Sequence, residues 1–256
     1  MKDYIADFHI HTLLSPCAEV EMTPHHIVMR AAEFGINAIA ITDHNGSANV
    51  PAALAAGERY GVKVFPGMEV ECVEEAHILA LFDTLEQSRQ WQGIIDTQMS
   101  GLKNNAAKLG AQYVVDDDDN FLWEEERMLS APTKMTAKEV VEQVNNLGGI
   151  AIAAHIDRPS NSMVGQLGFI EADFGFVAAE ISRAGWRNNL QSSLQRLAGF
   201  LPYVTDSDAH NIFDFIEGPK NILTVEKLSI AEIKMALQNE RGRFIKPGHF
   251  LDVDLS

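Results

Sequence analysis

The chain has 256 residues, of which 46% are hydrophobic, and a formal net charge of −16 from 20 basic and 36 acidic side chains. A surface that wraps nucleic acid is normally basic, so this balance argues against long nucleic acid as a partner, although it does not exclude a phosphorylated substrate. No apolar run reaches the roughly 18–20 residues of a membrane span. We therefore expect no membrane partner. The two cysteines form no disulfide framework, which is typical of a thiol-reducing compartment, so we expect a cytoplasmic protein.

Strand-like and helix-like segments alternate along the chain. The predicted strands are short apolar runs at residues 4–10, 37–45, 62–71, 76–82, 150–155, 176–182, 202–210 and 221–226. The predicted helices lie at residues 24–35, 50–61, 136–149 and 229–242, with a helical stretch from about 84 to 110 and an irregular acidic segment at 111–135. Thr136 and Glu139 have the spacing of a capping box. This alternation predicts a parallel sheet with helical crossovers.

The predicted strands are almost wholly apolar, which is typical of strands covered on both faces. Seven or eight such units in 256 residues fit a closed α/β barrel better than an open sheet. We expect residues 1–256 to form one barrel domain with an insertion at about 84–135.

Histidine, aspartate and glutamate residues occur on the predicted strands, mostly at their C-terminal ends, where α/β barrels form their active sites. A single histidine at such a place is usually structural. Here six of the nine histidines lie at five strand ends, and burying each of them unpaired would cost about 1–3 kcal/mol. They are His9, His11, His44, His77, His155 and His210. Metal coordination removes that cost, so the pattern predicts a metal centre.

The spacing within "HIH" supports this prediction. Alternate strand residues point to the same face, so His9 and His11 can reach one ion together. Asp208 and His210 in "DAH" repeat this spacing near the other end of the chain.

The motifs "DFHIHT", "ITDHN", "GMEVE", "AHIL", "AHIDRP", "EIS" and "DSDAH" follow one another between residues 7 and 210. In this order they resemble the polymerase and histidinol phosphatase (PHP) family of metal-dependent phosphoesterases. The resemblance implies a distorted (β/α)7 TIM-like barrel with a metal site at the C-terminal ends of the strands.

The resemblance also implies two or three divalent ions, of zinc, manganese or iron, held by imidazole and carboxylate groups. The implied ligand sets are His9, His11, Glu69 and Asp208; Glu69, His77 and His155; and His44 with His210. Where trinuclear relatives add a His or Asp to the third set, this chain has Cys17. Because thiolate is a zinc ligand, coordination by Cys17 would favour zinc over manganese or magnesium.

The chemistry implied is hydrolysis of a phosphate ester. Two ions that share Glu69 are expected to share a water and to lower its pKa toward neutrality, which makes hydroxide available to attack phosphorus. The leaving group then needs a proton or a cation, which the third site can supply. The expected catalytic residues are Asp208, His210 and Arg158.

Other polar residues near the expected ligands have supporting or substrate-binding interpretations. Arg158 and Arg183 can clamp a phosphate through paired hydrogen bonds, although each can also pair with a local acid. Glu180 is open between substrate contact and structural support. Asp7 and Asp43 are expected to orient ligand histidines from behind.

Three functions fit these residues. The first is a metal-dependent phosphoesterase for a small phosphorylated molecule or nucleotide. The second is an exonuclease-like or nucleoside bisphosphate phosphatase activity, and the third is a PHP module that binds metal without turnover. Specificity is expected to come from loops at 84–135 and 158–175; the substrate and the oligomeric state stay open.

Overall fold

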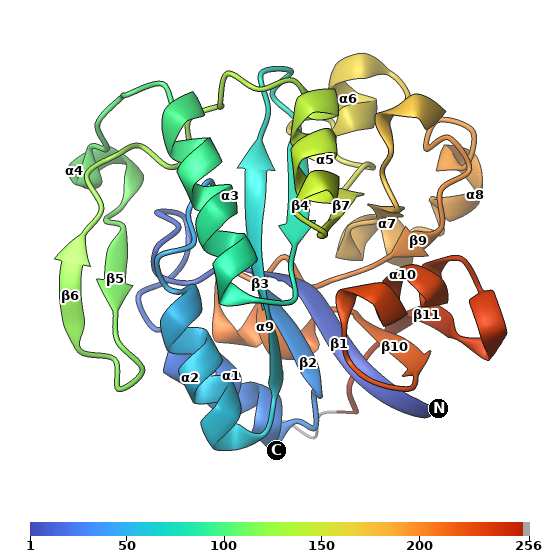
Figure 1. Cartoon of the computed structure of the whole chain (residues 1–256), viewed down its shortest axis with the longest axis horizontal. Helices are drawn as coiled ribbons and strands as arrows, with labels where there is room; N and C mark the ends of the chain where they lie inside the picture. Colours follow the sequence, from blue (N-terminus) through green and yellow to red (C-terminus); the bar gives the residue numbers. More distant parts are fainter. Residues whose placement is uncertain (253–256) are drawn as a thin grey trace.

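The computed structural model describes residues 1–252, and its main feature is a nine-stranded sheet (Figure 1). The strands lie in the order β11-β10-β1-β2-β3-β4-β7-β8-β9. Their bounds are β1 Lys2–Ile10, β2 Ala38–Ile41, β3 Lys63–Glu71, β4 His77–Leu81, β7 Ile150–Ala153, β8 Ala178–Glu180, β9 Tyr203–Val204, β10 Lys220–Val225 and β11 Phe244–His249.

The sheet curls until its two ends nearly meet. After β9 the chain returns to β1, where Ala209 forms a parallel bridge with Ile10 and the backbone N–H of His11 donates to the Ala209 carbonyl at 3.0 Å. Apolar side chains from strands all around the sheet pack in one buried cluster, which includes Phe8 and Phe65. The predicted α/β barrel is therefore confirmed.

Helices and 3-10 turns connect the strands and cover the outside of the sheet (Figure 1). The longer helices are α1 Pro24–Glu33, α2 Val50–Tyr60, α3 Leu85–Gln98, α5 Ala137–Asn146 and α10 Ile230–Leu237. The shorter ones are α4 Ala106–Leu109, α6 Met163–Leu167, α7 Arg183–Arg187, α8 Gln191–Leu194 and α9 Ile212–Glu217, with 3-10 turns η1 Ala172–Phe174 and η2 Glu240–Gly242. Within residues 1–252, none of the helices has the length and apolar character that crossing a membrane requires.

The prediction of a wholly parallel sheet is wrong in part. β4 runs antiparallel to both β3 and β7, and β10 runs antiparallel to β1 and β11. The link between β3 and β4, residues 72–76, is too short for a crossover, so the chain must turn back beside itself. As a result His77, at the start of β4, lies opposite Glu71 at the end of β3. It reaches the same rim as the C-terminal ends of the parallel strands.

The segment between β4 and β7 also differs from its prediction. Helix α3 ends at Gln98 because Met99 is extended and Gly101 has a φ of 75°. The stretch expected to be irregular contains a hairpin of β5 Tyr113–Val115 and β6 Phe121–Glu124, which projects at the left of Figure 1. That this segment is an insertion into one domain stays a prediction.

The end of the chain contains one strand that the sequence did not suggest. Strand β11 includes Pro247 and Gly248, which interrupt the alternating pattern expected of a strand. It is nevertheless paired with β10 at the edge of the sheet, where a missing backbone donor is tolerated.

The capping box predicted for α5 is present, and it supports a stability prediction. The Thr136 hydroxyl accepts from the Glu139 N–H, and the Glu139 carboxylate accepts from the Thr136 N–H. Thr136→Ala should lower the free energy of unfolding by about 1 kcal/mol in urea titrations, because it removes this cap. Thr136→Ser keeps the hydroxyl and should stay near wild type; equal losses in both variants would contradict the role of the cap.

Candidate metal centre

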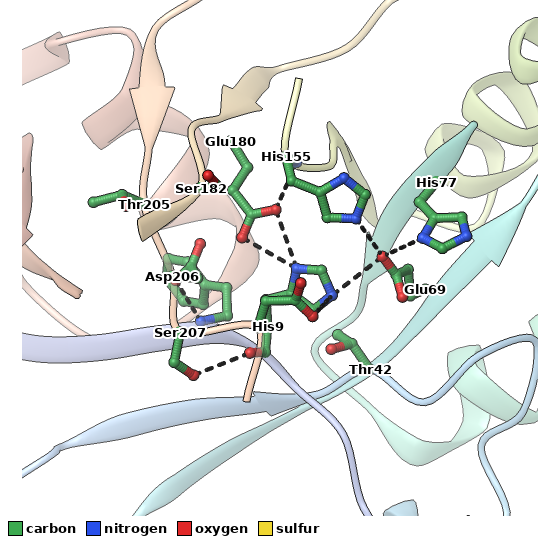
Figure 2. Close-up of polar contacts among 12 residues, drawn as sticks. His9, Thr42, Glu69, His77, His155, Glu180, Ser182, Thr205, Asp206 and Ser207 are labelled. Atoms are coloured by element: carbon green, nitrogen blue, oxygen red, sulfur yellow. Dashed lines mark hydrogen bonds and ion pairs between the residues drawn. The ribbon is translucent and has the colours of Figure 1, made fainter. Parts of the chain in front are cut away.

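The carboxylate of Glu69 lies at the centre of the histidine cluster and is only 1% exposed (Figure 2). Five imidazoles have a nitrogen within 3.4 Å of it. They are His77 at 2.8 Å, His44 at 2.9 Å, His155 at 3.1 Å, His9 at 3.2 Å and His11 at 3.4 Å. These side chains come from four segments of the barrel rim, with His9 and His11 on the same one, so the curled sheet is needed to bring them together.

A β-bulge positions the first pair of histidines. β1 has one extra residue relative to β2 between Asp7 and Ile10, and such bulges redirect neighbouring side chains. Phe8 packs inside the barrel, while His9 and His11 reach the rim, where their Nε2 atoms lie 3.2 Å apart. Both nitrogens are also 3.2 Å from Oδ1 of Asp208.

This spacing fits the binding of a cation. Two ligands that each lie about 2.1 Å from a tetrahedral zinc ion are roughly 3.4 Å from each other. The three mutual distances of 3.2 Å among His9, His11 and Asp208 are close to that value. The residues present therefore suit a divalent metal.

Hydrogen bonds behind the rings leave the nitrogens that face the site free to bind metal. His9 Nδ1 lies 3.1 Å from both oxygens of the Glu180 carboxylate. His11 Nδ1 lies 3.0 Å from the hydroxyl of Ser15, which in turn donates to Asp43 at 2.7 Å. In a neutral ring an Nδ1–H that donates leaves Nε2 bare, so each histidine can present a lone pair to the site once its ring is neutral.

These contacts bear on the supporting roles expected from the sequence. Glu180 is 1% exposed and contacts His9 and the backbone N–H of His155, which places it behind the ligands. Asp43 also lies behind them, but it acts on His11 through Ser15. Ser15 was missed by sequence reasoning, and its only signal was its place four residues after His11.

A third group of donor atoms lies at the mouth of the site. His11, His44 and His210 each offer a nitrogen within 4.8 Å of the others. His210 Nδ1 is hydrogen-bonded at 2.9 Å to the backbone carbonyl of Asp208, which leaves Nε2 as the ring nitrogen that can face the site. The exposed thiol of Cys17 lines the same cavity.

The observed groupings differ in detail from the three implied ligand sets. The groups of converging donor atoms are His9, His11 and Asp208; His44, Glu69 and His77; and His11, His44 and His210. His155 stands beside Glu69 but outside these groups within the described residues. How the ligands divide among the ions therefore stays a prediction.

The electrostatics of the cluster keep its carboxylates ionised. Burial raises the pKa of Glu69 and Asp208, but the neighbouring imidazoles outweigh burial and hold each pKa well below its usual range. Burial lowers the pKa of His9, yet Asp208, Glu180 and Glu69 together raise it well above its usual value. The pKa of His11 is lowered by burial and by the neighbouring histidines, which favours a neutral ring.

Two residues of the cluster have strained backbones. His155 and Asp208 have φ angles of 27° and 48°, in the left-handed region that residues other than glycine seldom adopt. Such conformations persist only where the surrounding structure holds them, and they concentrate at functional sites.

The predicted arginines lie near the site with different partners. Arg158 is 45% exposed, and its Nη2 lies 2.5 Å from Oδ2 of Asp208. Arg183 pairs with Asp214 at 3.1 Å and Glu217 at 3.0 Å, which is the local pairing kept open as its alternative. Substrate contact by either arginine stays a prediction.

Asp7 supports backbone atoms rather than a ligand ring. One carboxylate oxygen accepts from the N–H of Ser207 at 3.1 Å, and the other pairs with the buried Lys220 at 2.9 Å. We find no hydrogen bond from Asp7 to an imidazole ring among the described residues. Asp7 is two residues from His9, but the bulge between them redirects the ring.

Two cavities meet at the cluster. The first, which we call the metal cavity, has a volume of about 320 Å³ and is lined by Cys17, His44, Glu69, Glu71, His77, Ser130, His155, Arg158, Asn161, Asp208 and His210. The second, the arginine cavity, has a volume of about 640 Å³ and contains Arg158, Arg183 and Arg187. His155, Arg158 and Asp208 line both, so the two cavities adjoin at these side chains.

An α/β barrel with carboxylates and imidazoles converging on its rim is the arrangement typical of metal-dependent hydrolases. The model of the PHP domain matches residues 7–164, and the chain belongs to this family. The fold is thus that of PHP metal-dependent phosphoesterases and nucleases. The resemblance inferred from the motifs is confirmed.

Curated relatives include DNA polymerase III PolC-type proteins. That of Lactococcus lactis is 29% identical over 139 residues, which cover 51% of this chain and 8% of the relative. That of Caldanaerobacter subterraneus is 31% identical over 139 residues, covering 51% of this chain and 10% of the relative. The chain thus matches about a tenth of the length of these relatives.

Solved structures with the same fold include a lesion-specific endonuclease from Pyrococcus furiosus, with a TM-score of 0.67 and 20% identity. That match covers 95% of this chain and 58% of the endonuclease. A proposed metal-dependent phosphoesterase from Bifidobacterium adolescentis has a TM-score of 0.53 and 20% identity, covering 80% of this chain and 87% of that one. At these identities the likeness shows the fold alone.

The prediction that long nucleic acid is not a partner is wrong. A structure of endonuclease Q holds a 27-mer duplex with an abasic lesion at the active site. It shares this fold with a TM-score of 0.65 and 20% identity, and the match covers 95% of this chain and 58% of that one. Net charge sums over the whole surface, whereas binding depends on the local field, which bound cations reverse. An overall charge of −16 therefore does not exclude nucleic acid.

The two cysteines offer a chemical test of the site. Burial raises the pKa of Cys17, but His210 and His44 outweigh burial and lower it to about 6. Burial, with Glu74 nearby, raises the pKa of Cys72 to about 12. In chelator at pH 7, iodoacetamide should therefore alkylate Cys17 rapidly and leave Cys72 unmodified, as peptide mass spectrometry can measure. Zinc should slow the reaction at Cys17 if the thiolate binds it; equal rates for both cysteines in chelator would contradict the low pKa.

Proposed function

We propose that this chain hydrolyses phosphate esters with two or three divalent metal ions at the rim of the barrel. The observation that carries the proposal is the convergence of five imidazoles on the buried carboxylate of Glu69, with Asp208 beside it. The family match supports a hydrolase. The residues proposed to hold the ions are His9, His11, Cys17, His44, Glu69, His77, His155, Asp208 and His210.

Bound divalent ions would lower the pKa of a water and neutralise the oxygens of a phosphoryl group. The protein prepares for them by keeping Glu69 and Asp208 ionised and by orienting the Nε2 atoms of His9 and His11 toward the site. Glu69 contacts His9 and His11 as well as His77 and His155, so it is proposed to serve as a ligand of two ions.

Two further residues are proposed to act on the substrate. Arg158 lines both cavities, so its guanidinium can donate to a phosphoryl oxygen while the leaving group lies in the arginine cavity. Burial lowers the pKa of His210, but Cys17 and Asp208 raise it above its usual value. A protonated His210 can give its proton to the departing alkoxide when no third ion occupies that position.

The direct test is phosphate release. Zinc- or manganese-loaded protein should release phosphate from a panel of monoesters, diesters and nucleotides, and a chelator should abolish the activity. Glu69→Gln removes the proposed bridging charge and should reduce kcat about 100-fold or more, because losing a group that only orients a ligand already costs about 10- to 100-fold. The matched variant Glu86→Gln, exposed on α3, should behave as wild type. The proposal fails if the loaded wild type releases no phosphate from any member of the panel.

Hydrolysis of nucleic acid phosphodiesters is a second candidate. The three arginines of the arginine cavity favour it, because guanidinium groups beside the metal cavity can accept the phosphates that flank a scissile bond, although four carboxylates line the same cavity. The fold shared with endonuclease Q supports it as well. A module that binds metal without turnover is the third possibility, and the nearly complete ligand set argues against it.

Arg183 separates the first two candidates. Arg183→Gln should raise the KM for a short oligonucleotide about tenfold but leave that for a small monoester unchanged, because only the longer substrate fills the arginine cavity. Oligonucleotides with and without an abasic site should be assayed beside the monoester. Arg59→Gln serves as control, since Arg59 pairs with Asp117 and Asp118 outside both cavities. Equal effects of Arg183→Gln on both substrates would count against the second candidate.

A further inference from the structure

A buried ion pair lies beneath the proposed metal centre. Lys220 and Asp7 are both 0% exposed, and Lys220 Nζ lies 2.9 Å from Oδ2 of Asp7. The antiparallel register of β1 and β10, in which Ala6 faces Asn221, makes these two residues the next neighbours along the ladder. Burying two charges costs several kcal/mol per ion, and apolar replacements of such pairs are often as stable. Stability alone is therefore a poor explanation for this pair.

Lys220 uses all of its donors inside the protein. Besides Asp7, the ammonium donates to the backbone carbonyls of Phe215 at 2.5 Å and Gly218 at 3.1 Å. Phe215 belongs to α9, and Gly218 lies between α9 and β10. Lys220 thus ties β1 to the end of the helix that follows Asp208.

Asp7 connects this pair to the loop that carries Asp208. Its Oδ1 accepts from the N–H of Ser207 at 3.1 Å. The Ser207 hydroxyl in turn donates to the His9 carbonyl at 3.3 Å, as Figure 2 shows. Asp208 follows directly, in its strained conformation with a φ of 48°. The loop is clamped on both sides of Asp208, because Ala209 pairs with Ile10.

Gly218 packs closely against Ser207 in the loop that carries Asp208. A Cβ atom at Gly218 would lie 2.5 Å from Cβ and 2.9 Å from Cα of Ser207. The turn that Lys220 holds through the Gly218 carbonyl therefore packs closely against Ser207, the residue before Asp208. Any change in the ion pair should be transmitted to Asp208 by this contact and by the Ser207 N–H.

We propose that Lys220 and Asp7 are positioning residues, which hold Asp208 and His9 at the separation that one metal ion requires. The inference rests on the proposed function, since it assumes that Asp208 and His9 bind the same ion. Neither residue of the pair touches the ion or the substrate. They act through Ser207 and through the backbone of β1.

The test is a charge-neutral double variant, Asp7→Val with Lys220→Met, which avoids leaving one charge buried alone. The metal-free variant should fold with a lowered urea midpoint, because the carbonyls of Phe215 and Gly218 and the N–H of Ser207 lose their partners. Its affinity for zinc, measured by competition with a chromogenic chelator, should fall about 10- to 100-fold, as for other groups that orient ligands. Unchanged zinc affinity in the folded variant would overturn the inference.

A matched control is the buried pair of Glu232, in α10, and Arg243, which directly precedes β11. Their side chains are 2.7 Å apart. Glu232→Leu with Arg243→Met should leave zinc affinity unchanged. Gly218→Ala moves the same loop without altering charge, and should also weaken zinc binding. If this variant binds zinc as wild type does, the proposed transmission through Ser207 is wrong.

The failure of the inference is distinguishable from failure of the proposed function. A wild type that binds zinc tightly but hydrolyses no phosphoester would contradict the proposed function and leave the zinc comparison valid. A wild type that binds no zinc would overturn both. Loss of affinity in the Lys220 and Asp7 variant but not in the Glu232 and Arg243 variant supports the positioning role.

Discussion

The convergence of imidazoles on the carboxylate of Glu69 is the interaction on which the rest of the site depends. Five rings lie within 3.4 Å of one buried carboxylate, and four of them outweigh burial and lower the pKa of Glu69. These four are His77, His9, His44 and His155. Such a cluster holds together only if the opposing charges are compensated. In the protein alone, protonated imidazoles compensate the negative charges of Glu69 and Asp208. Bound divalent cations would take over that role.

The cluster also accounts for unusual features of the fold. The bulge in β1, the reversed strand β4 and the left-handed backbone at His155 and Asp208 all lie next to residues of the cluster. Each departs from regular barrel geometry, and each directs a side chain toward the same rim. Proteins commonly depart from regular local geometry at functional sites and offset the cost by stabilising contacts elsewhere in the fold.

Much of this arrangement could be anticipated from the sequence. Apolar runs ending in histidine or a carboxylate predicted the strands, the rim and the identity of the converging residues. The motif "HIH" predicted that His9 and His11 approach each other, and their Nε2 atoms are 3.2 Å apart. Thr136 and Glu139 likewise predicted the start of α5, because a capping box depends only on neighbours in the sequence.

What escaped prediction depended on contacts between distant segments. The direction of β4, the hairpin β5–β6 and strand β11 are decided by pairing partners that no local pattern specifies. The roles of Ser15 and Lys220 were hidden for the same reason: a hydroxyl or an ammonium is informative only once its partners are known.

The sequence by itself identified the residues that converge at the site, because residue type and strand period are local properties. Only the tertiary structure decided how they meet. The near closure of the sheet brings Asp208 to His9 across almost 200 positions of the chain, and a buried pair between β1 and β10 holds them there. Hydrogen bonds and charges act over a few ångströms, so their pattern exists only after the chain has folded.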